Sequence, residues 1–255
     1  MEKRFLPFLA SFSTLALLEI FLYQPHFVYF ILALVDYVLF YAAYKLTKDN
    51  LIDKRWWNLM ILPIVFTDGL IGYSTLIPFR SFFGSIQLLF LFDIFFVYIY
   101  LRAVYFYLVF PTEDRKTSLE NISSCGNFLS YFFISSLIFG LQSFVNASVW
   151  PLLLLIILAS GVLVYQMIWA SIDKIKENLI YIAVSCLILA ELAGAIFYLP
   201  FNFNIMGLSL AIIYYVMTGL IRVRLRGTLN KRIIKVYLGV GIASIFIILL
   251  TARWV

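Results

Sequence analysis

Acidic residues inside apolar stretches are the side chains of this sequence that could do chemistry. Of its 13 Asp and Glu residues, five lie within long apolar runs, and the others lie beside cations in polar segments. The five are Glu19, Asp36, Asp68, Asp93 and Glu191. A carboxyl group in such surroundings can take up a proton, ligate a cation or bind a polar solute. Inside a membrane it is therefore a candidate functional group.

Negative charge in these positions is expensive. An ionised Asp at the centre of a membrane span costs on the order of 2.5–3.5 kcal/mol, and several unpaired ones would cost about 10 kcal/mol together. The interiors of the apolar runs contain no lysine, and the nearest cations are Arg80 and Arg102, at the two ends of one run. Because there are too few bases to neutralise the acids, some acids must be protonated, share a proton, face water or bind a cation.

A structural role for the acids is the competing interpretation. A protonated carboxyl group can donate a hydrogen bond to a neighbouring helix and hold two spans together. Candidate partners are many tyrosines and the glutamines of the apolar runs, Gln87, Gln142 and Gln166. We favour function for Asp36, Asp68 and Asp93, because consecutive spans place all three near mid-depth. Glu19 and Glu191 are expected somewhat toward the outer side.

Nine apolar runs must position these residues. A membrane-spanning helix needs about 20 predominantly apolar residues, and the chain of 255 residues is 64% hydrophobic with a mean hydropathy of +1.01. We therefore expect an all-α fold, a polytopic transmembrane helical bundle of about nine spans that forms one integral membrane domain over residues 1–255. The expected spans are 5–23, 27–44, 57–77, 82–103, 127–146, 149–170, 179–199, 204–221 and 233–251.

The cations are sorted to one side of these spans. Of the 19 Lys and Arg residues, all except Arg80 and Arg253 lie at the N-terminus or around the connections after the second, fourth, sixth and eighth spans. Cationic connections stay in the cytoplasm, so the N-terminus is predicted to be cytoplasmic and the C-terminus external. The other connections are very short, and the spans that they join must therefore be antiparallel neighbours.

Two finer predictions concern the segment around Pro111. The helical pattern of the fourth span continues through Arg102–Phe110 and stops at Pro111, which predicts a helix longer than the membrane is thick. The stretch Thr117–Glu120 has the spacing of a capping box, which predicts that a short interfacial helix begins there.

Several chemistries and partners are disfavoured. No Gly-rich phosphate loop, HExxH pair or Gly-x-Ser-x-Gly elbow occurs, and a retinal-type Schiff base would need a lysine inside a span. We expect no cofactor and no metal, since His26 is the only histidine and the two cysteines lack metal-type spacing. The net charge is +6, and the basic residues that produce it flank the spans and form no single basic face. This pattern favours anionic lipid headgroups over nucleic acid as partners.

Three functions fit this pattern in a multi-pass protein of a prokaryotic cytoplasmic membrane. The first is a transporter-like protein whose acids bind a proton, cation or small solute, with Arg80 as an outer gate or counter-charge. The second is an intramembrane enzyme for a lipid-linked substrate, in which Asp68 or Asp93 is the base and Arg80 contacts phosphate. The third is a non-catalytic assembly factor that binds partner spans or another copy of itself. A mid-membrane pocket at the acids would favour transport, a lateral groove the enzyme, and a solid core the assembly factor.

Overall fold

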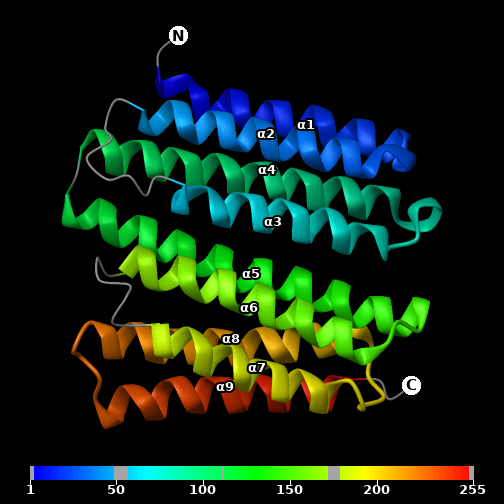
Figure 1. Ribbon diagram of the computed structural model, residues 1–255, viewed down its shortest axis with the longest axis vertical. Coiled ribbons are helices and arrows are strands. Elements are labelled where there is room, and N and C mark those ends of the chain that lie inside the picture. Colours follow the sequence, from blue (N-terminus) through cyan, green and yellow to red (C-terminus); the bar gives the residue numbers. More distant parts are fainter. Residues whose placement is uncertain (1–2, 49–56, 111, 172–178, 253–255) are drawn as a thin grey trace. The chain divides into compact units, whose positions relative to one another are not determined.

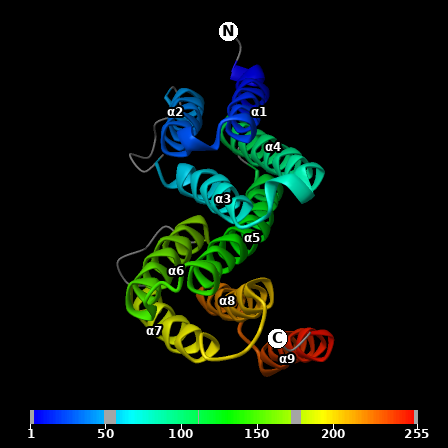
Figure 2. The ribbon, with the colours of Figure 1, turned by 90° about the vertical axis from the view of Figure 1, so that its right-hand side faces the viewer.

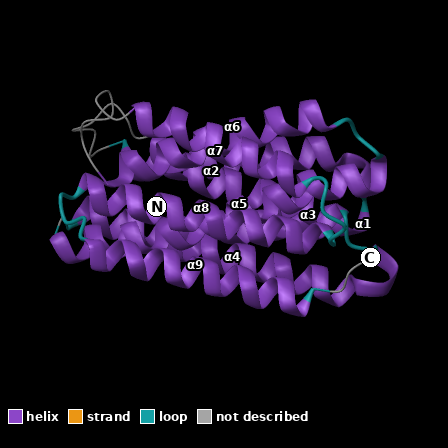
Figure 3. Ribbon diagram, turned by 90° about the horizontal axis from the view of Figure 1, so that it is seen from below, coloured by secondary structure: helices purple, strands orange, loops and turns teal. Residues whose placement is uncertain are grey.

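The computed structural model describes residues 3–48, 57–110, 112–171 and 179–252, and for residues 79–82 and Ser171 it describes the backbone alone. All regular elements within these ranges are helical (Figures 1 and 3), as predicted. Two 3-10 turns, η1 (Lys3–Phe5) and η2 (Pro25–Phe27), flank the first helix. The nine α-helices of the described residues are α1 (Leu6–Tyr23), α2 (Val28–Thr47), α3 (Asn58–Thr75), α4 (Phe79–Val109), α5 (Glu113–Val145), α6 (Val149–Ser171), α7 (Leu179–Ile196), α8 (Phe203–Leu225) and α9 (Lys231–Thr251).

Eight of these helices are long and apolar enough to cross a membrane, which makes the chain a multi-pass membrane protein. The helix outside this set is α3, whose polar residues include Thr67, Asp68 and Ser74. The span count of nine and the sides on which the termini lie stay predictions.

The ends of α4 and α5 test the two predictions around Pro111. Helix α4 runs to Val109, so the long fourth helix is confirmed. The predicted interfacial helix at Thr117–Glu120 is wrong, because α5 begins at Glu113 and continues unbroken to Val145. The Thr117 hydroxyl donates to the carbonyl of Glu113, 3.0 Å away. It therefore bonds one turn back in a helix that has already begun, and it caps no helix start.

The chain divides into two compact units, Met1–Gly126 and Asn127–Val255, with the boundary inside α5. The prediction of a single membrane domain stays a prediction. In the first unit, α1 packs against α2 and α4, and α3 packs against the same two helices (Figure 2). The rings of Phe21 on α1 and Phe90 on α4, with centroids 6.1 Å apart, lie in this core. Four helices thus enclose one interior, and the side chains that face it decide its chemistry.

The second unit is held by polar as well as apolar contacts. Helices α6, α7 and α8 pack against one another, and α9 packs against α8. Asn127 of α5 donates through Nδ2 to Oε1 of Gln166 on α6, 2.6 Å away. The ring of Tyr131 on α5 stacks on that of Tyr214 on α8 with centroids 4.3 Å apart, and its hydroxyl is 3.0 Å from that of Ser160 on α6. Gln166, a candidate partner for an acid, therefore bonds to an amide.

Candidate functional site

Three aspartates from three helices meet inside the first unit. They are Asp36 of α2, Asp68 of α3 and Asp93 of α4. The carboxyl groups of Asp36 and Asp68 are close enough to interact directly. Asp68 is also close enough to Asp93 for the two side chains to interact electrostatically. We call these three residues the aspartate cluster.

Helical periodicity explains why these side chains turn inward. On α4 the buried face includes Phe90 and Val97, and Asp93 continues that face because it lies three residues after the first and four before the second. On α2, Asp36 directly follows Val35, which is completely buried, and it is itself half-buried. The cluster therefore extends from the half-buried Asp36 to Asp93, whose side chain is 0% exposed.

A hydroxyl group completes one end of the cluster. Thr67 of α3 donates through Oγ1 to Oδ1 of Asp93, 2.9 Å away, and both residues are completely buried. Thr67 was not among the side-chain partners expected from the sequence, which were Ser, Gln and Tyr. Its signal was its position directly before Asp68, which puts it on the same turn of α3 as a cluster residue.

Each carboxyl group of the cluster has one buried oxygen that receives no hydrogen bond from a described residue. No residue that the structure describes offers a hydrogen-bond partner to Oδ1 of Asp36, Oδ1 of Asp68 or Oδ2 of Asp93, although all three atoms are buried. Structural acids in a membrane protein are expected to satisfy their oxygens on neighbouring helices. The cluster does not follow that pattern, because only Asp93 receives a hydroxyl donor.

The contact between Asp36 and Asp68 fixes one chemical property of the cluster. An ionised carboxylate has only acceptor oxygens, so two carboxyl groups can hydrogen-bond to each other only when one of them carries a proton. No described Lys, Arg or His forms an ion pair with either group. Two adjacent carboxyl groups with no described cation beside them can share one proton.

The remaining predicted site residues lie elsewhere. Glu19 is half-buried on α1 and forms no hydrogen bond or ion pair with a described residue. Glu191 belongs to the second unit, where its side chain is exposed on α7. Arg80 lies in the first turn of α4, and its side chain is outside the described residues. The structure thus brings together three of the five acids.

The described residues of the cluster offer carboxyl groups but not the arrangement of a metal site. Within the described ranges, no group of three or more His, Cys, Asp or Glu side chains has the arrangement of a metal site. Two surface pockets of the described part of the first unit, with volumes of about 430 Å³ and about 180 Å³, are not lined by any aspartate of the cluster. What the geometry offers is an array of carboxyl groups that can hold and exchange a proton.

Comparison with known proteins places the chain in a family. No curated protein and no solved structure matches it. A family profile matches residues 42–251, a range that includes Asp68 and Asp93 but begins after Asp36. The chain therefore belongs to the family described as Protein of unknown function (DUF5656).

Proposed function

We propose that this protein is a proton-coupled, transporter-like membrane protein whose aspartate cluster binds and releases the proton. The observation that carries the proposal is the close approach of the Asp36 and Asp68 carboxyl groups, because two adjacent acids with no described cation beside them can share one proton. The third acid, Asp93, extends the array into a completely buried position. Intramembrane carboxyl groups arranged in series are the usual components of proton relays.

The packing around the cluster favours a proton over the other two candidates, a metal cation and a small solute. A solute needs a cavity of its own size, and a cation needs several converging ligands. A proton needs only successive hydrogen-bonding groups. Asp93 is 0% exposed and lines neither pocket, so a proton is the ligand that this interior fits best.

A simple exchange follows from the geometry. A proton on Asp36 is donated to Asp68 and leaves Asp36 as the carboxylate, and the reverse transfer restores the first state. From Asp68 the proton can pass to Asp93 when the two carboxyl groups approach. Thr67 holds Oδ1 of Asp93 by its hydrogen bond, which leaves Oδ2 as the oxygen that accepts the proton. The cluster thus links a half-buried acid with a completely buried one.

Infrared difference spectroscopy tests the shared proton without knowledge of a transported solute. The C=O stretch of a protonated carboxyl group shifts when H2O is exchanged for D2O, and a carboxylate does not show this band. We expect the wild-type protein to show the band at neutral pH and D68N to lose it. The control is D114N, which removes an exposed acid at the start of α5. Equal spectra for D68N and D114N would contradict the proposal.

Proton flux is the second test. Proteoliposomes that contain a pH-sensitive dye are given a membrane potential, and proton uptake is followed. We expect D68N to slow the uptake by roughly tenfold or more, the effect of removing a positioned proton carrier, and D114N to leave it unchanged. Wild-type vesicles that take up protons no faster than protein-free vesicles would show that the cluster does not conduct protons by itself.

A further inference from the structure

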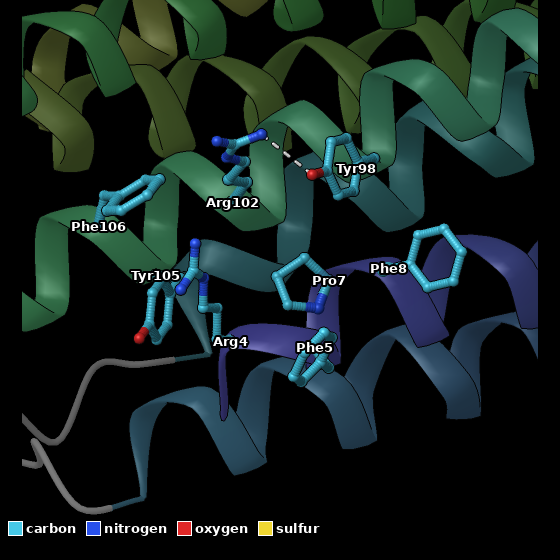
Figure 4. Close-up of a pocket in the computed structure, with 8 residues that line it drawn as sticks. All are labelled: Arg4, Phe5, Pro7, Phe8, Tyr98, Arg102, Tyr105 and Phe106. Atoms are coloured by element: carbon cyan, nitrogen blue, oxygen red, sulfur yellow. Dashed lines mark hydrogen bonds between the residues drawn. The ribbon is translucent and has the colours of Figure 1, made fainter. Parts of the chain in front are cut away.

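A pocket at the cationic end of the first unit is a second candidate site. Its volume is about 430 Å³, and it lies between the start of the chain and the C-terminal part of α4 (Figure 4). This position is distinct from the aspartate cluster, whose residues do not line it. The side chains that give the pocket its character are Arg4, Pro7, Phe8, Tyr98, Arg102 and Tyr105.

The pocket is positively charged, and no described acid neutralises it. Its lining contains two arginines and no acid. Arg102 donates through Nη1 to the Tyr98 hydroxyl, 3.0 Å away. Its guanidinium also lies over the rings of Tyr98 and Phe106, at 5.8 and 5.5 Å from their centroids. Neither Arg4 nor Arg102 forms an ion pair with any residue that the structure describes. Most donors of both guanidinium groups are therefore available to an anion.

The arrangement matches the way proteins bind phosphate. The planar guanidinium offers paired N–H donors that fit two phosphate oxygens, and two arginines can neutralise one phosphate. Because Tyr98 and Phe106 hold the Arg102 side chain, less freedom is lost when an anion binds. Arg115 provides a third guanidinium nearby. It lines the adjoining pocket of about 180 Å³, and its guanidinium carbon lies 5.1 Å from the centroid of the same Phe106 ring.

Depth along α4 indicates where the phosphate comes from. Arg102 follows Asp93 by nine residues, which is about 13.5 Å along a helix axis. If Asp93 is near mid-membrane, this rise brings Arg102 to the edge of the hydrocarbon core, whose half-thickness is about 15 Å. The headgroup phosphates of lipids lie at that level. The exposed ring of Phe8, on the helix that packs against α4, is apolar surface suited to an acyl chain.

We propose that Arg4 and Arg102 form a binding site for a phosphate group, carried by an anionic phospholipid whose acyl chains lie along α1 and α4. This site is more specific than the general attraction of lipids to basic connections, because it combines a pocket, two guanidinium groups and an aromatic lining. A soluble phosphate ester would present the same chemistry, so the test must distinguish the two sources.

Binding to purified protein in mild detergent provides the test. Phosphatidylglycerol is titrated into the protein in one series and inorganic phosphate in another, and the complexes are counted by native mass spectrometry. The test variant is R4Q/R102Q, in which both replaced side chains are exposed. The matched control is R232Q/K235Q, which removes two exposed cations from the first turns of α9. A third variant, R4K/R102K, keeps the charge but loses the paired donors.

We expect R4Q/R102Q to bind phosphatidylglycerol roughly tenfold or more weakly than wild type. R232Q/K235Q should match wild type, and R4K/R102K should lie between the two. If R4Q/R102Q loses inorganic phosphate but binds phosphatidylglycerol as wild type does, the arginines bind phosphate and the carrier is a soluble ester. That result would overturn the assignment to a phospholipid. Equal loss in R4Q/R102Q and R232Q/K235Q would overturn the proposal, because net charge would then explain the binding. Circular dichroism checks that all the variants keep their helices.

Discussion

Thr67 and Asp93 join α3 to α4 by a hydrogen bond of 2.9 Å between two completely buried side chains. The replacement T67V keeps nearly the same volume but removes the donor, and it leaves Asp93 without any hydrogen-bond partner among the described residues. We expect the free energy of unfolding in detergent to fall by about 0.5–2 kcal/mol, the range for a hydrogen bond between helices. Chemical denaturation followed by circular dichroism measures it.

The control for T67V is T14V. Thr14 of α1 is equally buried, but its hydroxyl donates to the carbonyl of Ser11 within the same helix, 2.8 Å away. T14V should therefore leave the free energy of unfolding nearly unchanged. If both valine variants lose the same stability, the contact with Asp93 contributes nothing beyond the presence of a hydroxyl group.

Asparagine replacements separate a structural from a functional role of the cluster. In D93N the amide oxygen can still accept from Thr67, and in D36N or D68N an amide can still bond to the remaining carboxyl group. We expect all three variants to accumulate in the membrane and to unfold within about 1 kcal/mol of wild type, because no charge needs to be buried. Membrane yield and unfolding curves measure this.

The opposite outcome would have a clear meaning. If D36N, D68N and D93N fail to accumulate, the carboxyl groups are needed for folding and hold the helices together. The proton proposal would then lose its main support, since the residues could not be said to have been kept for an activity.

The sequence predicted the helices well because the runs of apolar residues that mark them can be recognised along the chain without knowledge of tertiary contacts. Apolar runs and short connections give boundaries close to the observed ones except at the start of α5, and the long α4 ends at Val109 as the pattern predicts. The meeting of Asp36, Asp68 and Asp93 was also foreseeable, since hairpin connections make consecutive helices neighbours. Where the signal was only a local motif, as at Thr117–Glu120, the prediction failed because α5 begins earlier, at Glu113, with Glu113 and Asp114 in its first turn.

The side-chain partners were not predictable from the sequence alone. Which residue of α3 faces Asp93 depends on the rotation of α3 about its own axis, and packing with α2 and α4 sets that rotation. Thr67 could therefore be identified as the donor to Asp93 only from the structure. The pocket of Arg4 and Arg102 has the same origin: the two arginines are 98 positions apart in the chain, and the packing of α1 on α4 brings them together.

Close packing of α5 on α8 leads to a prediction about Gly207. Ser135 of α5 donates to the Gly207 carbonyl, 3.1 Å away, and a Cβ atom added at Gly207 would lie 2.7 Å from the backbone nitrogen of Ser136. We expect G207A to lower the free energy of unfolding by about 1–3 kcal/mol, the usual cost of overpacking. Denaturation curves of the variant and the wild type give the difference.

Gly84 of α4 provides a matched control for G207A. A Cβ atom at Gly84 would meet nothing within 4 Å, so G84A should be neutral or should stabilise the helix by about 0.5–1 kcal/mol. Should G207A prove as harmless as G84A, the two helices would have to be further apart in the native protein than their hydrogen bond implies.

The orientation of the chain is open to a direct test at the two ends of α8. In a C125S/C186S background, Y198C places a thiol in the connection before α8, where Tyr198 is 81% exposed. T228C places one in the exposed connection after α8. Since the second connection is flanked by Arg222, Arg226 and Lys231, the positive-inside rule puts it in the cytoplasm. A membrane-impermeant maleimide should label Y198C in intact cells but T228C only after the cells are opened. Labelling of T228C in intact cells would reverse the topology and would put the arginine pocket, which the same rule assigns to the T228C side, at the external face.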